Sequence, residues 1–163
     1  MKFQQDVEKH ALIQARSRSL KPRILIIDDQ IPRVSAGQGF ARIVRLVETL
    51  QNTGFAATVA ATAHVGSVQW PEIWQELGPD IECIPDLSPR TLEAFLSERE
   101  GSYQLLWVSR PHNLSYLREI QSRRPKLLNT PIIYDAEALT TANRVSTDGQ
   151  EISITELQEN AQG

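Results

Sequence analysis

Apolar runs and helical periodicities alternate along the chain, and this alternation predicts a series of strands and helices. Residues 23–28 (RILIID) are apolar almost without a break, which is typical of a parallel strand covered on both faces. Between Phe40 and Leu50, apolar residues recur at the spacing of one helical face, with charged residues between them. Continued in this way, the pattern predicts strands at 23–28, 56–61, 81–84, 103–108 and 131–135, and helices at 40–50, 70–77, 89–100 and 112–123.

The order of these elements indicates the fold class. Strands that alternate with helices imply βαβ crossovers, which are nearly always right-handed. We therefore expect a single α/β domain with a doubly wound parallel sheet, and an antiparallel hairpin among the first three strands would contradict it. Local signals agree with the expected helix ends, because Ser88 is a good N-cap residue and Gly54 and Gly78 lie where helices would stop.

The chain divides into three parts. Residues 1–22 are interpreted as a lead-in, a weak helix followed by a basic linker. Residues 23–145 form the predicted domain. Residues 146–163 are polar and no closing strand follows, so we expect a truncated tail there.

Composition and charge narrow the class of protein. Of the 163 residues, 40% are hydrophobic and 23% charged, as in one folded globular domain. The net charge of −3 gives no general attraction to phosphate backbones, so we expect no nucleic-acid partner. The single cysteine, Cys83, excludes an internal disulfide and a cysteine zinc site, and its apolar surroundings favour a buried side chain over a nucleophile.

Targeting signals point to the cytoplasm. No apolar run is long enough to span a bilayer, and charges interrupt the first 20 residues where a signal peptide needs an apolar stretch. We expect a cytoplasmic protein, with work at the inner face of a membrane left open. Neither a zinc motif nor a P-loop is present.

Polar residues gather after three of the predicted strands. In an open parallel sheet, ligands bind at the carboxyl ends of the strands, where crossovers to opposite faces leave a crevice. The sequence therefore predicts one site built from neighbouring strand ends. The candidates are Asp28, Asp29, Gly37, Gln38 and Gly39 after the first strand, Ser109, Arg110, His112 and Asn113 after the fourth, and Asp135 and Glu137 after the fifth.

Each candidate has a functional and a structural interpretation. The turn at residues 37–39 could bring backbone N–H groups to a phosphate, or only make a tight turn into a helix. Arg110 could hold phosphate or carboxylate with its planar fork, or pair with Asp135. His112 could act as a base or bind a sugar hydroxyl, or cap the next helix. Asp135 and Glu137 could orient hydroxyls or serve as a base, or simply begin a solvated acidic helix.

Three tryptophans invite a comparison with sugar-stacking sites. Trp107 lies inside a predicted strand and is expected in the core. Trp70 and Trp74 are one helical turn apart, and we interpret them as a packing face rather than a binding platform.

Four stretches within residues 22–140 carry a further signal: ILIIDDQIP, SAGQGFARIVRLVETL, YQLLWVSRPHN and PIIYDAEAL. Together they resemble the amino-terminal domain of glycosyltransferases with two facing Rossmann-like halves, the GT-B architecture. In particular, the chain is similar to the retaining group 1, glycosyltransferase-family-4-like enzymes of bacterial surface-polysaccharide synthesis. The last two stretches are the more specific, in this order and spacing, whereas the glycine loop alone is not.

The resemblance implies a nucleotide-diphosphate sugar as donor substrate and a saccharide or lipid-linked acceptor. It implies neither a further cofactor nor a metal, since such enzymes generally balance the diphosphate charge with basic side chains and a helix terminus. It makes His112 and Asp135 the catalytic candidates, and it assigns donor or acceptor binding to Gly37, Gln38, Gly39, Arg110, Asn113 and Glu137. The second half, with most nucleotide contacts, is missing from this sequence, so we expect the isolated domain to be inactive. After Asp135 the chain reads AEALTTAN, where related sequences often carry an aromatic residue or His, so acceptor contacts there differ.

Two other classes remain open from the sequence. The run ILIIDDQ resembles the acid pair that opens receiver-like signalling domains, but the chain lacks the Lys that should end the fifth strand of a receiver, and only Asp86 follows the third. A Rossmann-like interaction module without catalysis is the other alternative.

Overall fold

The structure is a computed structural model of the chain, and it describes residues 19–63, 68 and 70–136. Strands and helices alternate along this part of the chain. The strands are β1 (Arg23–Asp28), β2 (Ala56–Ala61), β3 (Glu82–Ile84), β4 (Leu105–Ser109) and β5 (Ile132–Asp135). The helices are the short 3-10 turn η1 (Val34–Ala36), α2 (Gln38–Asn52), α3 (Trp70–Leu77), α4 (Pro89–Glu98) and α5 (Pro111–Arg123).

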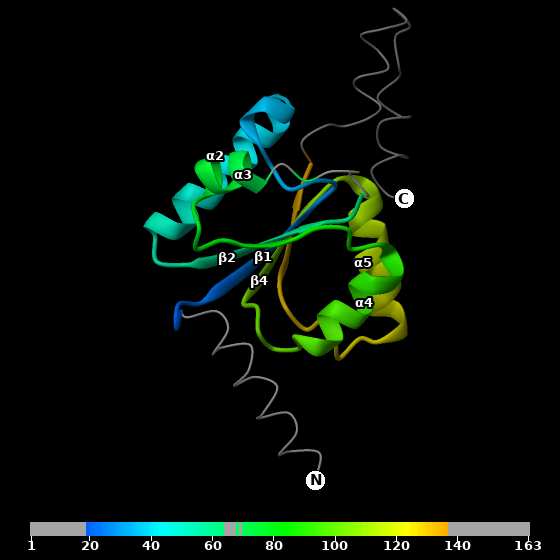
Figure 1. Cartoon of the computed structure of the whole chain (residues 1–163). Helices are drawn as coiled ribbons and strands as arrows, with labels where there is room; N and C mark the ends of the chain where they lie inside the picture. The colour runs from blue at the N-terminus through cyan, green and yellow to red at the C-terminus, as the bar shows by residue number, and fades with distance from the viewer. Residues whose placement is uncertain (1–18, 64–67, 69, 137–163) are drawn as a thin grey trace, which may run out of the picture.

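The five strands form one sheet in the order β3-β2-β1-β4-β5, and every pairing is parallel. Helices α2 and α3 lie on one face, and α4 and α5 on the other (Figure 1). The chain moves outward from β1 through β2 to β3, then returns across the sheet to β4 on the other side of β1. The predicted doubly wound, Rossmann-like α/β fold is confirmed. Receiver domains have the order 2-1-3-4-5, so this strand order differs from theirs.

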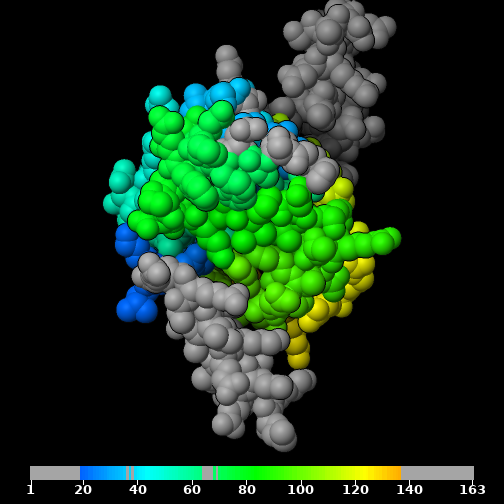
Figure 2. Space-filling model, in the orientation of Figure 1, coloured from blue at the N-terminus to red at the C-terminus, as the bar shows by residue number. Residues whose placement is uncertain are grey.

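Both faces of β1 are buried, which explains its unbroken apolar sequence. All six of its residues are buried, and its four apolar residues alternate between two core clusters. Leu25 and Ile27 pack in the cluster that contains α4 and α5 residues, and Ile24 and Ile26 in the cluster that contains α2 and α3 residues. Residues of α3 and α4, green in Figure 2, cover much of the face toward the viewer.

Most predicted elements agree with the structure, and the differences have local causes. Strand β4 begins at Leu105 instead of 103, because its pairing with β1 begins at Ile24 and Leu105. The Tyr103 side chain packs beside Phe95 and accepts a hydrogen bond from Arg99. Ser88 caps α4 as predicted, since its hydroxyl accepts a hydrogen bond from the Thr91 N–H at 3.3 Å.

The predictions for the cysteine and for two of the three tryptophans agree with the structure, and the prediction for the third does not. Burial, together with the charge of Glu82, raises the pKa of the Cys83 thiol to about 12, which agrees with a non-nucleophilic side chain. Trp70 and Trp107 pack against the core. Trp74 stacks on Trp70 with ring centroids 5.7 Å apart, yet its own exposed fraction is 53%. The interpretation of both α3 tryptophans as a packing face is therefore wrong for Trp74.

A partly buried ionic network joins the amino-terminal ends of three strands. Arg99 donates two hydrogen bonds to the Glu82 carboxylate, at 2.7 and 2.8 Å, and Thr58 donates a third at 2.8 Å. Burial alone would raise the pKa of Glu82, but its hydrogen bonds and the charges of Arg99 and Arg23 outweigh burial and lower the pKa. This network therefore links β1, β2 and β3 to the residue that follows α4.

We expect Leu92→Ala to lower the free energy of unfolding by about 2–5 kcal/mol, because it removes a fully buried side chain and leaves a cavity between α4 and the sheet. Leu20→Ala is the matched control, since Leu20 is 96% exposed; its effect should stay within about 0.5 kcal/mol. Urea unfolding curves measure both, and equal effects of the two substitutions would contradict the assignment of the core.

Candidate functional site

The carboxyl ends of β1 and β4 mark the point where the chain reverses its direction across the sheet. Helix α2 leaves β1 toward one face, and α5 leaves β4 toward the other (Figure 1). Diverging connections at adjacent strands leave the crevice in which doubly wound sheets bind ligands. Asp28 and Asp29 end β1 here, and residues 109–113 (SRPHN) lead from β4 into α5.

Arg110 lies at this crevice in an unusual backbone conformation. It is the N-cap residue of α5 and has φ 75, a left-handed value that is uncommon for a residue with a side chain. Its Nε donates a hydrogen bond to Asp28 Oδ1 at 3.2 Å, and its guanidinium lies 5.7 Å from the centre of the Phe40 ring. Strained residues of this kind persist where the surroundings hold them, often at functional sites.

The alternative pairing of Arg110 with Asp135 is wrong. Arg110 follows β4, which pairs directly with β1, and its side chain forms an ion pair with Asp28 at the end of β1. Asp135 instead accepts hydrogen bonds from Arg42 and from the Trp107 indole N–H, the latter at 3.1 Å. Asp135 therefore belongs to a contact between β5, β4 and α2 on the same edge of the sheet.

Asp28 is a buried carboxylate in an incomplete hydrogen-bond environment. Its Oδ1 accepts from Arg110 and from the Asp29 N–H, the latter at 2.7 Å. Its Oδ2, like the hydroxyl of Ser109, is buried without a hydrogen-bond partner among the described residues. Burial raises the pKa of Asp28 above its ordinary value, and the hydrogen bonds and positive charge that oppose this effect are weaker. Asp28 in its ionised form therefore opposes folding.

Asp29 holds the histidine of the site. Its Oδ1 lies 2.6 Å from His112 Nε2 and accepts a hydrogen bond from Asn113 Nδ2 at 3.2 Å. The buried Asn113 also donates to the Ser109 carbonyl and accepts from Thr62 Oγ1 at 2.7 Å. Side chains from the ends of β1 and β2 thus fix the first turn of α5.

His112 itself remains accessible. About half of its side chain is exposed, and its ring meets the edge of Tyr116 at 5.9 Å between centroids. No side chain makes a capping hydrogen bond at the α5 N-terminus, so the interpretation of His112 as a helix cap is wrong.

The glycine turn leads directly into α2. Gly37 is the N-cap residue and has φ 129, a conformation that residues with side chains rarely adopt. A Cβ atom added there would meet nothing within 4 Å, so the space beside Gly37 is open. Open backbone at the first turn of a 15-residue helix suits an anion, because free N–H groups and the helix dipole both favour negative charge.

The predicted site residues divide into two neighbouring groups. Arg110, His112 and Asn113 converge on the acid pair of Asp28 and Asp29, whereas Asp135 contacts Arg42 instead. Glu137 and the side chain of Gln38 lie outside the described residues.

Three contributors were missed by the sequence reasoning. Phe40, Arg42 and Thr62 each contact a candidate residue, but nothing in their local sequence distinguishes them from ordinary helix and loop positions. The sequence places Asp28 and Asp29 among the candidates at the strand end, but the resemblance assigns neither of them a role. Two acidic side chains directly after a buried strand were the available signal.

Among the described residues, no three His, Cys, Asp or Glu side chains come together as a metal site. No helix within the same ranges is both long and apolar enough to cross a bilayer.

The fold and this crevice define the class: a three-layer α/β protein with a doubly wound, Rossmann-like sheet and a polar cluster at its switch point. No known protein family matches the chain by its sequence model, and no curated protein is significantly similar in sequence.

We expect Asp28→Asn to make the protein more stable at pH 7. The raised pKa means that folded Asp28 keeps its proton to higher pH than unfolded Asp28, so stability falls as pH rises from about 3.8, the ordinary value, through the folded pKa. Asparagine removes this loss, and its advantage should shrink as the pH is lowered toward 3.

Urea unfolding of the wild type and of Asp28→Asn at pH 7, 5 and 3 measures the difference in their free energies of unfolding. The other carboxylates are present in both proteins, so their titration cancels in this difference. Asp80→Asn is the control, since Asp80 is exposed. A stability difference between Asp28→Asn and the wild type that does not change with pH would contradict the raised pKa.

Proposed function

We propose that this domain is the amino-terminal, acceptor-side half of a glycosyltransferase of the GT-B architecture. It would act on a nucleotide-diphosphate sugar and a saccharide or lipid-linked acceptor, together with a second half that carries most donor contacts. The observation that carries the proposal is the Asp29–His112 pair, with 2.6 Å between carboxylate and imidazole, at the switch point of the sheet. The four sequence stretches that resemble this class support it.

The chemistry of His112 follows from its partner. An ionised Asp29 accepts a hydrogen bond from the Nε2–H group of His112, and in that neutral tautomer Nδ1 carries the lone pair. A neutral imidazole of that tautomer can accept a hydrogen bond from a sugar hydroxyl, or its proton. Asp29 fixes the ring and stabilises any positive charge that develops on it, as carboxylates paired with catalytic histidines do. His112 is exposed enough to meet such a hydroxyl.

The donor diphosphate would meet positive potential from two sources. The N-terminus of α2 with its open Gly37 supplies backbone N–H groups, and the guanidinium of Arg110 lies near the first turn of the same helix, at Phe40. When the sugar leaves, negative charge grows on the diphosphate, and donors already aimed at it stabilise the transition state. Asp28 keeps Arg110 oriented for this role.

Asp135 has a different part in this proposal. Its Oδ2 already accepts hydrogen bonds from Arg42 and Trp107, so the carboxylate is engaged by the protein itself. We therefore assign Asp135 to positioning Arg42 on the first turns of α2, and we assign the role of base to His112.

Arg110→Lys should reduce kcat/KM of the two-half enzyme by about ten- to a hundredfold, because the charge remains but the planar fork and its charged hydrogen bonds are lost. His112→Ala should also slow transfer. Arg118→Lys, on the exposed side of α5, is the control and should leave the rate unchanged. Unchanged kcat/KM with a lowered melting temperature for Arg110→Lys would instead assign Arg110 a structural role.

The 163-residue chain alone should show no turnover with any nucleotide sugar and only weak donor binding. Catalysis in a cleft between two halves needs both walls to position the reactants and exclude water. A radiolabelled-sugar transfer assay on the purified chain tests this. Transfer that co-purifies with the chain and disappears in His112→Ala would show that one half is sufficient and would contradict the two-half proposal.

A further inference from the structure

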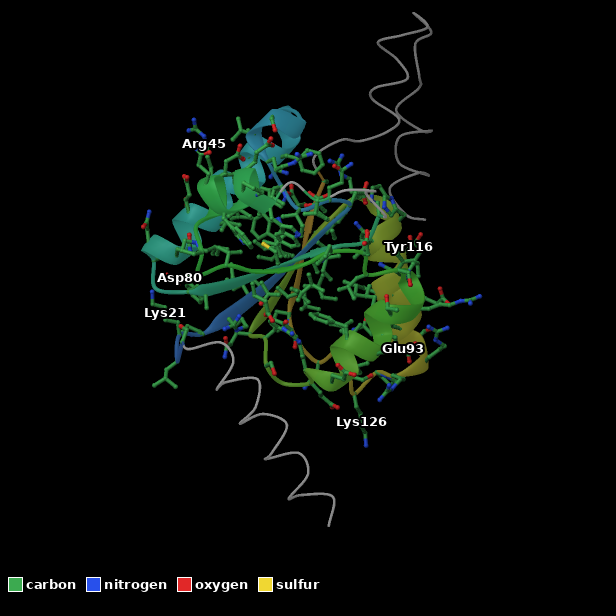
Figure 3. All side chains as sticks on the ribbon, viewed as in Figure 1. Lys21, Arg45, Asp80, Glu93, Tyr116 and Lys126 are labelled. Carbon is green, nitrogen blue, oxygen red and sulfur yellow. The ribbon has the colours of Figure 1, made fainter. Side chains whose placement is uncertain are left out.

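A second feature lies at the opposite end of the sheet from the crevice. A cavity of about 540 Å³ opens at the amino-terminal ends of β1, β2 and β3, a volume within the range of small-molecule sites. Its lining includes Lys21, Arg23, Phe55, Asp80, Ile81 and Glu82. Figure 3 shows Lys21 and Asp80 at the end of the sheet where β1 begins. Arg23 and Asp28 are the first and last residues of β1, so this cavity lies about 17 Å from the crevice.

Arg23 is the most unusual group of the cavity wall. Its side chain is only 10% exposed, yet it uses a single nitrogen for its hydrogen bonds. Nη1 donates to Thr58 Oγ1 at 3.1 Å and to Glu82 Oε2 at 3.5 Å. Within the described part of the chain, Nε and Nη2 of Arg23 have no partner. Neither atom is among the buried polar atoms that lack a partner, so both stay accessible, and a ligand in the cavity that Arg23 lines can accept hydrogen bonds from them.

The charge balance of the same network points to an anion. Glu82 is the only carboxylate that Arg23 contacts among the described residues, and Arg99 already holds that carboxylate with two shorter hydrogen bonds. One negative charge is thus shared by two guanidinium groups, which leaves a surplus positive charge on Arg23. An anionic ligand in the cavity would balance this surplus.

We propose that this cavity is a binding site for a small molecule with an oxyanion group, a phosphate or a carboxylate. Nε and Nη2 of Arg23 form the side of the guanidinium fork that binds two oxygens of one such group. Lys21 at the rim adds positive charge, and Phe55 and Ile81 offer apolar surface to the body of the ligand. Asp80 at the same rim disfavours a second anionic group.

This site is independent of the proposed glycosyl transfer. It uses none of the crevice residues and lies at the other end of β1, so either assignment can fail without the other.

The test is a titration of the ¹⁵N-labelled 163-residue chain, followed by ¹H–¹⁵N NMR at constant ionic strength. Inorganic phosphate, phenyl phosphate and benzoate are the probes, and they distinguish phosphate from carboxylate and show the contribution of an apolar body. We expect saturable shifts at the amides of Ala56, Ala57 and Ile81, which line the cavity. Shifts at His112 or Asn113 would report a separate event in the crevice.

Three variants separate the site from general charge effects. Arg23→Gln should weaken binding at least about tenfold, the usual consequence of losing a charged hydrogen bond. Lys21→Ala leaves the buried network intact and should weaken binding about threefold, as an exposed charge contributes less. Arg45→Gln makes the same charge change on the exposed side of α2 and should leave Kd unchanged.

Saturation by the two phosphates alone would support a phosphate site. Saturation by benzoate as well would support a site that also accepts a carboxylate. Absence of saturable shifts with all three probes would overturn the proposal. So would equal affinities of Arg45→Gln and Lys21→Ala, a comparison that stays informative even where Arg23→Gln does not fold.

Discussion

Burial of β1 on both faces and both edges is the constraint on which the rest of this structure depends. The strand pairs with β2 on one side and β4 on the other, and its side chains fill two separate core clusters. A strand in this position needs helices over both faces, and it can be followed along the chain only by crossover connections. The reversal of the chain beside β1, and hence the crevice at its carboxyl end, is a consequence of that burial.

The two ends of β1 carry opposite charges, Arg23 and Asp28, and the carboxylates at the two ends have different hydrogen-bond environments. At the amino-terminal end, hydrogen bonds and nearby positive charges lower the pKa of Glu82 despite its burial. At the carboxyl end, burial raises the pKa of Asp28, and one of its oxygens lacks a partner among the described residues. Groups that oppose folding are expected where a protein keeps them for binding or chemistry. The contrast agrees with the proposals that the carboxyl end carries the reaction and that Arg23, at the other end, is a binding group.

Strain and charge act together at Arg110. Its left-handed backbone conformation opposes folding, and the following Pro111 fixes the direction in which α5 leaves the sheet. The hydrogen bond to Asp28 and the contact with Phe40 hold the side chain between β1 and the first turn of α2. One residue thus connects the acid pair to the glycine turn, which are distant in sequence but adjacent at the switch point.

The sequence by itself determined the elements whose signals are local. Strands β1 and β2 and helix α3 have the predicted bounds, because unbroken apolar runs and helical spacing report burial directly, and the Ser88 cap depends on one neighbouring turn. The expected position of a site, at the carboxyl ends of the strands, followed from the parallel order. Only the tertiary structure decided the pairings within it, that Arg110 binds Asp28 rather than Asp135 and that Asp29 holds His112. Strand order, and not sequence distance, determines which ends are neighbours, and hydrogen bonds between side chains about 80 residues apart leave no local pattern to read.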